Sequence, residues 1–340
     1  MGALSGKAIL RIAGKREDSV VEAVAWVVMG EAGEMDIKQK ASFSAIVSAG
    51  ILAGCKFLVG IFSGSMAVLA SAVDSLLDVS MSAMNFLAIR KAGKPADLFH
   101  PYGHGKAENL AAIFQSMVIV FSGSYIIFSS VKKYIESHKI EYSILDLGVM
   151  ILSLIFSFFI STHLRRIGDA TGSSALKADA LHYTSDLYSN TAALLAILLT
   201  YFTGRPFFDL FFAVIVGCIV IFSAGSIARN AVMGLMDSRI PKLMEEELVS
   251  TLKEMPYPYA GFHKLRTRLS GSKIYADLHV LFCRTLRIEE AHQHTRELER
   301  QISRKIPSID IVTHIEPCEE PCENTEETCT IRKMEKEEGE

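Results

Sequence analysis

Two aspartates lie inside a long apolar run, in the stretch ASAVDSLLDVSMSA at residues 70–83. Asp74 and Asp78 are four residues apart, so a helix would place both carboxylates on one face, one turn apart. An ionised aspartate at the centre of a bilayer costs about 2.5–3.5 kcal/mol on insertion scales. Two aspartates in one membrane helix therefore need a compensating partner.

A second polar pair has the same spacing. The stretch LKADALHYTSDLYSN contains His182 and Asp186 in another apolar run. We expect the helix with Asp78 and the helix with Asp186 to cross the membrane in opposite directions. Asp78 then lies about 18 Å, and Asp186 about 15 Å, from the membrane face at which the respective helix begins. Both depths are close to the midplane of a hydrocarbon core about 30 Å thick.

Three carboxylates and one imidazole at one depth form a set of oxygen and nitrogen ligands. Four such ligands suit tetrahedral Zn²⁺, and Cd²⁺, Co²⁺ or Fe²⁺ would also be accepted. The alternative is that each polar residue only hydrogen-bonds across a helix interface. Two pairs at matching depth favour the cation site.

A third set of candidate ligands lies in the stretch KPADLFHPYGHGKAEN. Asp97, His100 and His104 have the spacing D-x-x-H-x-x-x-H, which is typical of metal ligands. Spacing alone leaves open both a metal site and a solvated loop with two surface histidines.

Three further polar residues lie in the apolar runs. Lys56 is interpreted as a lysine that either pairs with a carboxylate or snorkels to the interface, and snorkelling is favoured. Asn85 and Asn190 extend the polar faces of the two helices that carry these pairs. Each asparagine could line a path for the cation or make a hydrogen bond in helix packing, and both interpretations stay open.

These residues need membrane helices to position them. Half of the 340 residues are hydrophobic, and the apolar runs are about 18–25 residues long, the length that spans a bilayer. The runs predict six spans, at residues 43–63, 66–90, 108–130, 144–164, 176–202 and 207–229.

Lysine and arginine are more frequent on one side of these spans, which the positive-inside rule identifies as the cytoplasm. Both termini are then cytoplasmic, and the membrane is the cell inner membrane. The formal net charge of -3 gives no indication of a nucleic-acid partner.

From about residue 238 the patterns change to helix, strand, strand, helix, strand, which predicts a compact α+β domain. The expected organisation is an N-terminal extension (1–37), a six-helix membrane domain (38–232), a cytoplasmic domain (238–317) and a disordered tail rich in Cys and Glu (318–340). The extension is either dispensable or an amphipathic surface helix. For Cys318, Cys322 and Cys329, metal handling and a merely solvated tail both stay open.

The motifs DSLLD, HPYGHGKAE, LKADALHYTSD, HKLRTRLSG and THIEP together resemble those of the cation diffusion facilitator family, most closely its bacterial zinc and ferrous-iron efflux branch. The resemblance covers roughly residues 38–317. It implies a homodimer with six membrane helices per protomer and a ferredoxin-like cytoplasmic domain. It also implies a transport site from Asp74, Asp78, His182 and Asp186 and a loop site from Asp97, His100 and His104.

The same resemblance implies a binuclear cytoplasmic site. Its ligands would be His263, His279, His292, His314 and Glu316, where Glu316 stands at a position at which this branch commonly has Asp. It further implies a salt bridge between protomers, formed by Lys106 and Asp237.

The resulting hypothesis is a transporter that exports Zn²⁺, and also Cd²⁺, Fe²⁺ or Co²⁺, in exchange for protons. No G-x-x-x-x-G-K-[ST] nucleotide motif is present, so the energy is expected from an ion gradient. Without H-E-x-x-H or a nucleophile elbow, an enzyme is not expected. A membrane-anchored metal sensor or scaffold remains the alternative.

Overall fold

The computed structural model describes residues 35–318, apart from 65, 137–143, 204–206, 255–258, 272, 285 and 307. Nearly all of the predicted N-terminal extension and of the tail after Cys318 lies outside the described residues, including Cys322 and Cys329.

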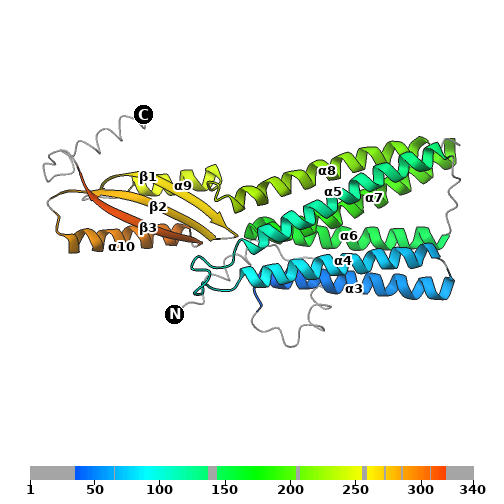
Figure 1. The fold of residues 1–340 in the computed structure, drawn as a ribbon, viewed down its shortest axis with the longest axis horizontal. Helices are drawn as coiled ribbons and strands as arrows, with labels where there is room; N and C mark the ends of the chain where they lie inside the picture. The colour runs from blue at the N-terminus through cyan, green and yellow to red at the C-terminus, as the bar shows by residue number, and fades with distance from the viewer. Residues whose placement is uncertain are drawn as a thin grey trace.

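Six long helices lie side by side in one elongated bundle (Figure 1). They are α3 (Ile37–Ser63), α4 (Met66–Ala92), α5 (Ala107–Ile135), α6 (Ile144–Thr171), α7 (Ser174–Thr203) and α8 (Phe207–Leu235). Each corresponds to one predicted span. Several helices continue a turn or more beyond it, because polar residues extend a helix outside its apolar segment.

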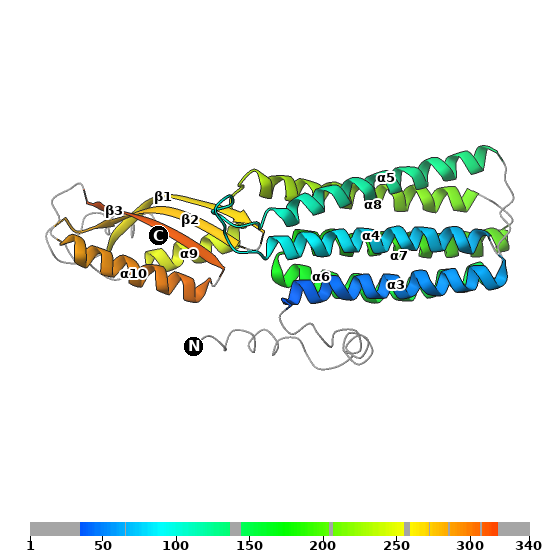
Figure 2. The same cartoon turned by 60° about the horizontal axis from the view of Figure 1, so that its bottom comes forward.

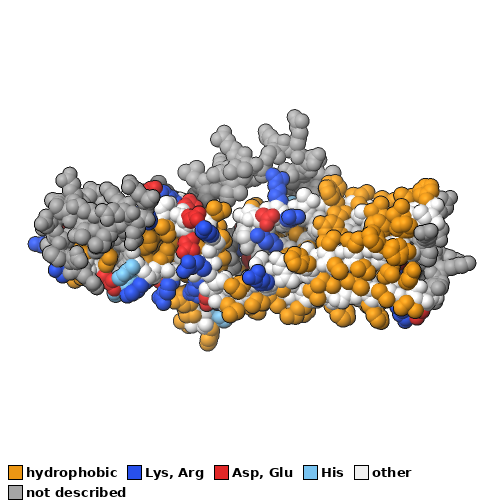
Figure 3. All heavy atoms as spheres, turned by 90° about the horizontal axis from the view of Figure 1, so that it is seen from above, with side chains coloured by type: hydrophobic (Ala, Val, Ile, Leu, Met, Phe, Trp, Pro, Cys, Tyr) orange, Lys and Arg blue, Asp and Glu red, His pale blue; other side chains and the backbone are white. Residues whose placement is uncertain are grey.

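Five of these helices are long and apolar enough to cross a membrane: α3, α4, α5, α6 and α8. Helix α7 carries Asp179, His182 and Asp186 along its length and packs against α5, α6 and α8. Large apolar side chains are exposed on the outside of the bundle, where they form a broad hydrophobic surface (Figure 3). An exposed apolar surface of this extent fits a lipid environment.

Small residues let α5 and α8 approach closely. A Cβ atom added at Gly217 of α8 would lie 2.5 Å from Ile127 Cγ1 and 3.1 Å from the carbonyl oxygen of Gly123 on α5. Glycine at this crossing therefore permits backbone contact, as is usual between membrane helices.

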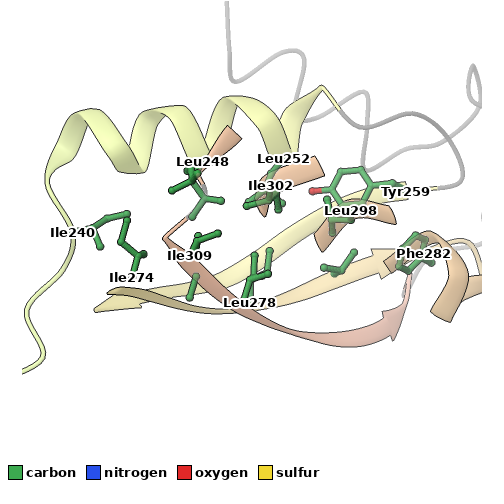
Figure 4. Close-up of a cluster of buried hydrophobic side chains, with 14 of the residues drawn as sticks. Ile240, Leu248, Leu252, Tyr259, Ile274, Leu278, Phe282, Leu298, Ile302 and Ile309 are labelled. Atoms are coloured by element: carbon green, nitrogen blue, oxygen red, sulfur yellow. The ribbon is translucent and has the colours of Figure 1, made fainter. Parts of the chain in front are cut away.

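The C-terminal part is the expected α+β domain. It consists of α9 (Lys242–Lys253), β1 (Tyr259–Ser270), β2 (Lys273–Phe282), α10 (Ile288–Lys305) and β3 (Ile309–Pro317). The sheet order is β1-β2-β3, with β1 antiparallel and β3 parallel to β2. Leu248 and Leu252 of α9, Leu298 and Ile302 of α10 and Leu278 of β2 meet in its buried core (Figure 4).

This domain extends the long axis of the bundle, at the end where α5 begins and α8 finishes (Figure 1). The loop between α4 and α5 lies at the junction of the bundle and the α+β domain, next to the turn that joins β1 to β2 (Figure 2). The predicted fold, a bundle of six long helices followed by an αββαβ domain, is confirmed, and five of the six helices meet the length and hydropathy of a membrane span.

Candidate metal centres

A cavity of about 360 Å³ lies inside the helical bundle. Its lining includes Asp74 and Asp78 of α4 and His182 and Asp186 of α7, so all four residues predicted for the membrane site face one space. Residues of α3, α5 and α6 complete its walls.

Three of the four residues form a compact group, here called the central cluster: Asp78, His182 and Asp186. Each offers a ligand atom within 4.8 Å of the others. His182 Nε2 lies 2.9 Å from Asp78 Oδ1. Asp74 lines the same cavity one helical turn away but is not in this group. Zinc ligands lie about 2 Å from the metal, and thus about 3.3 Å apart in a tetrahedron, so small shifts of these side chains would let the cluster hold a cation.

Lys56 of α3 corrects the interpretation made from sequence. Its side chain does not snorkel to an interface. It is only 7% exposed, lines the cavity, and Nζ donates a hydrogen bond to Ser75 Oγ at 2.8 Å. An ammonium group therefore shares the cavity with the carboxylates.

A buried carboxyl that sequence reasoning missed, Asp179, lies three residues before His182. Asp179 Oδ1 accepts hydrogen bonds from Ser82 Oγ at 3.2 Å and Gln115 Nε2 at 3.1 Å. Asn85 donates to Gln115 Oε1, so Asn85 serves in packing. This network joins α4, α5 and α7 between the cavity and the start of α7. The only sequence signal was the helical spacing of Asp179 to His182.

The predicted loop residues also come together. Asp97, His100 and His104 offer ligand atoms within 4.8 Å of one another, and are here called the loop cluster. Asp97 Oδ1 lies 3.1 Å from His100 Nδ1, and Asp97 Oδ2 lies 3.3 Å from His104 Nε2. Within the described residues, neither ring nitrogen of buried His104 makes a hydrogen bond. Such buried nitrogens fit a metal ligand.

The loop backbone supports this arrangement. The His100 amide donates to Asp97 Oδ1 at 2.7 Å, and this hydrogen bond is the main reason that the pKa of Asp97 lies below its ordinary value. A lower pKa keeps the carboxylate in the ionised form that binds metal.

The loop is held against the α+β domain. Arg268 of β1 places Cζ 4.3 Å from the centre of the Tyr102 ring and 4.8 Å from that of Tyr275. Tyr275 OH donates to the Tyr102 carbonyl at 2.8 Å. At Gly105 a Cβ would overlap the carbonyl group of Ser270. The loop cluster is thus attached to both halves of the chain.

A third group lies on the sheet. His263, His279 and Glu316 offer ligand atoms within 4.8 Å and are here called the sheet cluster. Glu316 accepts from His263 Nε2 and His279 Nδ1, each at 2.7 Å. His314 Nε2 lies 3.7 Å from Glu316 Oε1.

The strand register explains this group. His263 pairs with His279, and His279 pairs with His314, so three histidines lie in a row across β1, β2 and β3. Glu316 follows His314 by two residues and therefore points to the same face. Its hydrogen bonds with His279 and then His263 hold the pKa of Glu316 below the ordinary value for a glutamate.

His292 is not brought into this group within one chain. It lies exposed on α10, whose buried residues Ala291, Thr295 and Leu298 face the sheet. Helix α10 contributes to the core beside Leu278 of β2, whereas neighbouring His279 points to the other face. His292 as a ligand therefore stays a prediction, which a single chain does not test.

Lys106 and Asp237 also pair, within one chain; the predicted salt bridge between protomers stays a prediction. Lys106 Nζ lies 3.0 Å from Asp237 Oδ1. Arg268 NH1 lies 3.2 Å from the same oxygen. Asp237 follows the end of α8 with a φ of 55°, and so it links the helical bundle to β1.

Comparison with known proteins gives consistent matches along the chain. Residues 42–236 match the cation efflux transmembrane domain, and residues 240–318 match the cytoplasmic domain of cation efflux proteins. The cation-efflux pump FieF of Salmonella paratyphi A is 34% identical over 279 residues, which are 82% of this chain and 92% of the relative. FieF of Salmonella typhi has the same identity and coverage.

Solved structures that match in part include two of CzrB, a protein studied as a zinc transporter. One is 28% identical with a TM-score of 0.23 and covers 23% of this chain and 98% of that chain. The other, a zinc form, is 29% identical with a TM-score of 0.24 and covers 25% and 98%.

Proposed function

The chain belongs to the cation diffusion facilitator family of cation-efflux transporters, and we propose that it exports Zn²⁺ from the cytoplasm in exchange for protons. The observation that carries this proposal is the central cluster. Two carboxylates and an imidazole from α4 and α7 converge in a cavity inside the bundle. Asp74, on the same cavity wall, supplies the fourth ligand after a small movement.

The choice of zinc rests on ligand chemistry. Imidazole suits Zn²⁺ better than Mn²⁺ or Mg²⁺, which favour oxygen ligands only. Cd²⁺, Fe²⁺ and Co²⁺ are further candidate substrates, because the affinity of such a site for divalent metals follows their intrinsic chemistry, summarised by the Irving–Williams order, and does not by itself select one physiological metal.

Proton exchange follows from His182. A neutral imidazole binds the metal, whereas a protonated imidazole repels it. Because Nε2 of His182 lies 2.9 Å from Asp78, a proton arriving on His182 is stabilised by the same carboxylate that the metal leaves. Alternating access of the cavity would then exchange one cytoplasmic cation for external protons.

The orientation and assembly complete the proposal. Lysines and arginines between α4 and α5, near the C-terminal end of α6 and after α8 support a cytoplasmic α+β domain, cytoplasmic termini and an inner-membrane location. We propose a homodimer, with the cytoplasmic domain as one of the contacts.

The loop and sheet clusters are proposed as further zinc sites with a structural or regulatory role. The buried, unbonded nitrogens of His104 and the row of His263, His279 and His314 are the observations that support them. The carboxylate of Glu316 is a suitable zinc ligand in place of Asp.

Zinc uptake into proteoliposomes tests the proposal. Full-length protein is reconstituted with Zn²⁺ outside, and the interior is made acidic or is equilibrated with the outside by an ionophore. We expect the acidic interior to drive Zn²⁺ uptake and the ionophore to reduce it strongly. Zn²⁺ uptake at the same rate with and without the pH gradient would contradict proton exchange. Tight Zn²⁺ binding without uptake would favour the metal sensor or scaffold.

A further inference from the structure

Lys56 introduces a positive charge into the cavity of the central cluster. Its side chain is 7% exposed, and its Nζ donates to Ser75 Oγ at 2.8 Å. Ser75 lies on α4 between Asp74 and Asp78. The described hydrogen bond of the ammonium therefore goes to a neutral hydroxyl, which leaves the carboxylate oxygens available.

The charged and titratable residues that line this cavity are few. They are three carboxylates, one lysine, one histidine and one tyrosine: Asp74, Asp78, Asp186, Lys56, His182 and Tyr183. Lysine is ordinarily protonated at neutral pH. Burial disfavours the charged form of a lysine, whereas Asp74, Asp78 and Asp186, which line the same cavity, favour it.

With a neutral His182, the carboxylates and the ammonium leave the cavity two negative charges. One divalent cation neutralises that charge. Without the ammonium, three negative charges would remain, and a bound divalent cation would leave one uncompensated. Inside a protein, where the effective dielectric constant is about 20, such a difference changes ion binding strongly.

We propose that Lys56 is a permanent counter-cation of the transport cavity: it matches the cavity to one divalent ion and, by repulsion, weakens binding enough for the ion to be released. This inference rests on the proposed function, because it needs the central cluster to be the transport site. It adds a residue that sets affinity without ligating the metal.

The test is the Zn²⁺ affinity of the central cluster in detergent-solubilised full-length protein. To isolate this cluster, the loop and sheet clusters are removed in every sample by His100→Ala, His104→Ala, His263→Ala and His279→Ala. On this background, Lys56→Met and Lys56→Gln remove the charge and Lys56→Arg keeps it. Lys91→Met, at the exposed end of α4, removes a lysine outside the cavity and serves as the matched control.

We expect both neutral variants to bind Zn²⁺ about tenfold more tightly or better, and to release it more slowly. Lys56→Arg and Lys91→Met should stay within about twofold of the background. A merely structural role would weaken binding in the neutral variants, so tighter binding distinguishes the two roles. Unchanged or weaker binding in both neutral variants would overturn the inference.

Asp78→Ala on the same background separates this inference from the proposed function. If Asp78→Ala abolishes Zn²⁺ binding while Lys56→Met has no effect, only the role of Lys56 is wrong. If Asp78→Ala leaves binding intact, the assignment of the transport site is wrong, and the role of Lys56 fails with it.

Discussion

At the scale of the residue, we propose that His182 sets which cations the central cluster prefers. It is the only nitrogen ligand among the predicted membrane-site residues, and Nε2 lies 2.9 Å from Asp78. His182→Asp would convert the site to oxygen ligands only, which suit Mn²⁺. We expect the variant to lose at least about tenfold in Zn²⁺ affinity relative to Mn²⁺, since even lost outer-shell partners cost a metal site tenfold or more.

Competition between Zn²⁺ and Mn²⁺ in binding to the solubilised protein measures this preference. Asp186→Asn is the matched comparison, because it removes a carboxylate and keeps the imidazole. Equal relative affinities in His182→Asp and the unaltered protein would contradict the role given to the imidazole.

Single residues also mark the limit of prediction from sequence. Asp74, Asp78, His182 and Asp186 could be found because each pair shares one helix face, and spacing reveals that. Lys56 and Asp179 could not be assigned in this way. Their partners, Ser75 for Lys56 and Gln115 for Asp179, lie on other helices, and the contacts depend on how the helices are rotated in the bundle.

At the scale of the element, the loop between α4 and α5 couples the bundle to the sheet. Gly105 packs directly on the β1–β2 turn, where a Cβ at Gly271 would lie 2.8 Å from the Gly105 carbonyl oxygen. Gly105→Ala would push the loop away from this turn, because its Cβ would overlap the carbonyl group of Ser270. We expect about tenfold weaker Zn²⁺ binding at the loop cluster, since its ligands lose their support.

The measurement is Zn²⁺ binding to full-length protein in which the central and sheet clusters have been removed by Asp78→Ala, His263→Ala and His279→Ala. Gly93→Ala, at the other end of the same loop, is the control, because its Cβ would meet only ordinary contacts at 3.5 Å. Weakening by both glycine variants to the same degree would contradict the specific role of Gly105.

Asp237 links two elements through charge. Burial alone would raise its pKa, but the hydrogen bonds from Lys106 and Arg268 outweigh burial and hold the pKa below its ordinary value. The ionised carboxylate therefore stabilises the folded chain above the unfolded pKa of about 3.9, and this stabilisation is lost as the pH falls through the lower folded value.

We expect Asp237→Asn to lower the melting temperature at pH 7 by about 1–3 °C, the scale for an exposed ion-pair group in a chain of this size. The difference should shrink and disappear as the pH falls through the folded pKa of Asp237. Thermal unfolding of both proteins from pH 7 to pH 3 measures this. A difference that persists unchanged at pH 3 would exclude charge as its cause.

The elements themselves were largely predictable. The six helices follow from apolar runs of bilayer length, and the order of the α+β domain follows from the change to alternating and helical periods. His292 shows that such patterns do not indicate which face of the sheet a helix covers. The amphipathic pattern of α10 identifies Ala291, Thr295 and Leu298 as its inner face, but the face of the sheet that α10 covers depends on tertiary packing.

At the scale of the whole molecule, three clusters of candidate metal ligands lie along the part of the chain that the structure describes. The central cluster lies within the bundle, the loop cluster at the junction and the sheet cluster on the α+β domain. Asp237 and Arg268 connect the junction to both sides. This arrangement supports a coupling in which zinc bound outside the bundle influences the helices that carry the central cluster.

The central claim is that the residues of α4 and α7 form the path of the cation, and zinc flux in proteoliposomes tests it most directly. The unaltered protein is compared with Asp78→Ala under an acidic interior. Asp169→Asn is the control, because Asp169 pairs with Lys177 at the C-terminal end of α6, outside the central cluster. We predict flux in the unaltered protein and in Asp169→Asn, and none above empty vesicles in Asp78→Ala. Equal flux in Asp78→Ala and the unaltered protein would show that the cation takes another path.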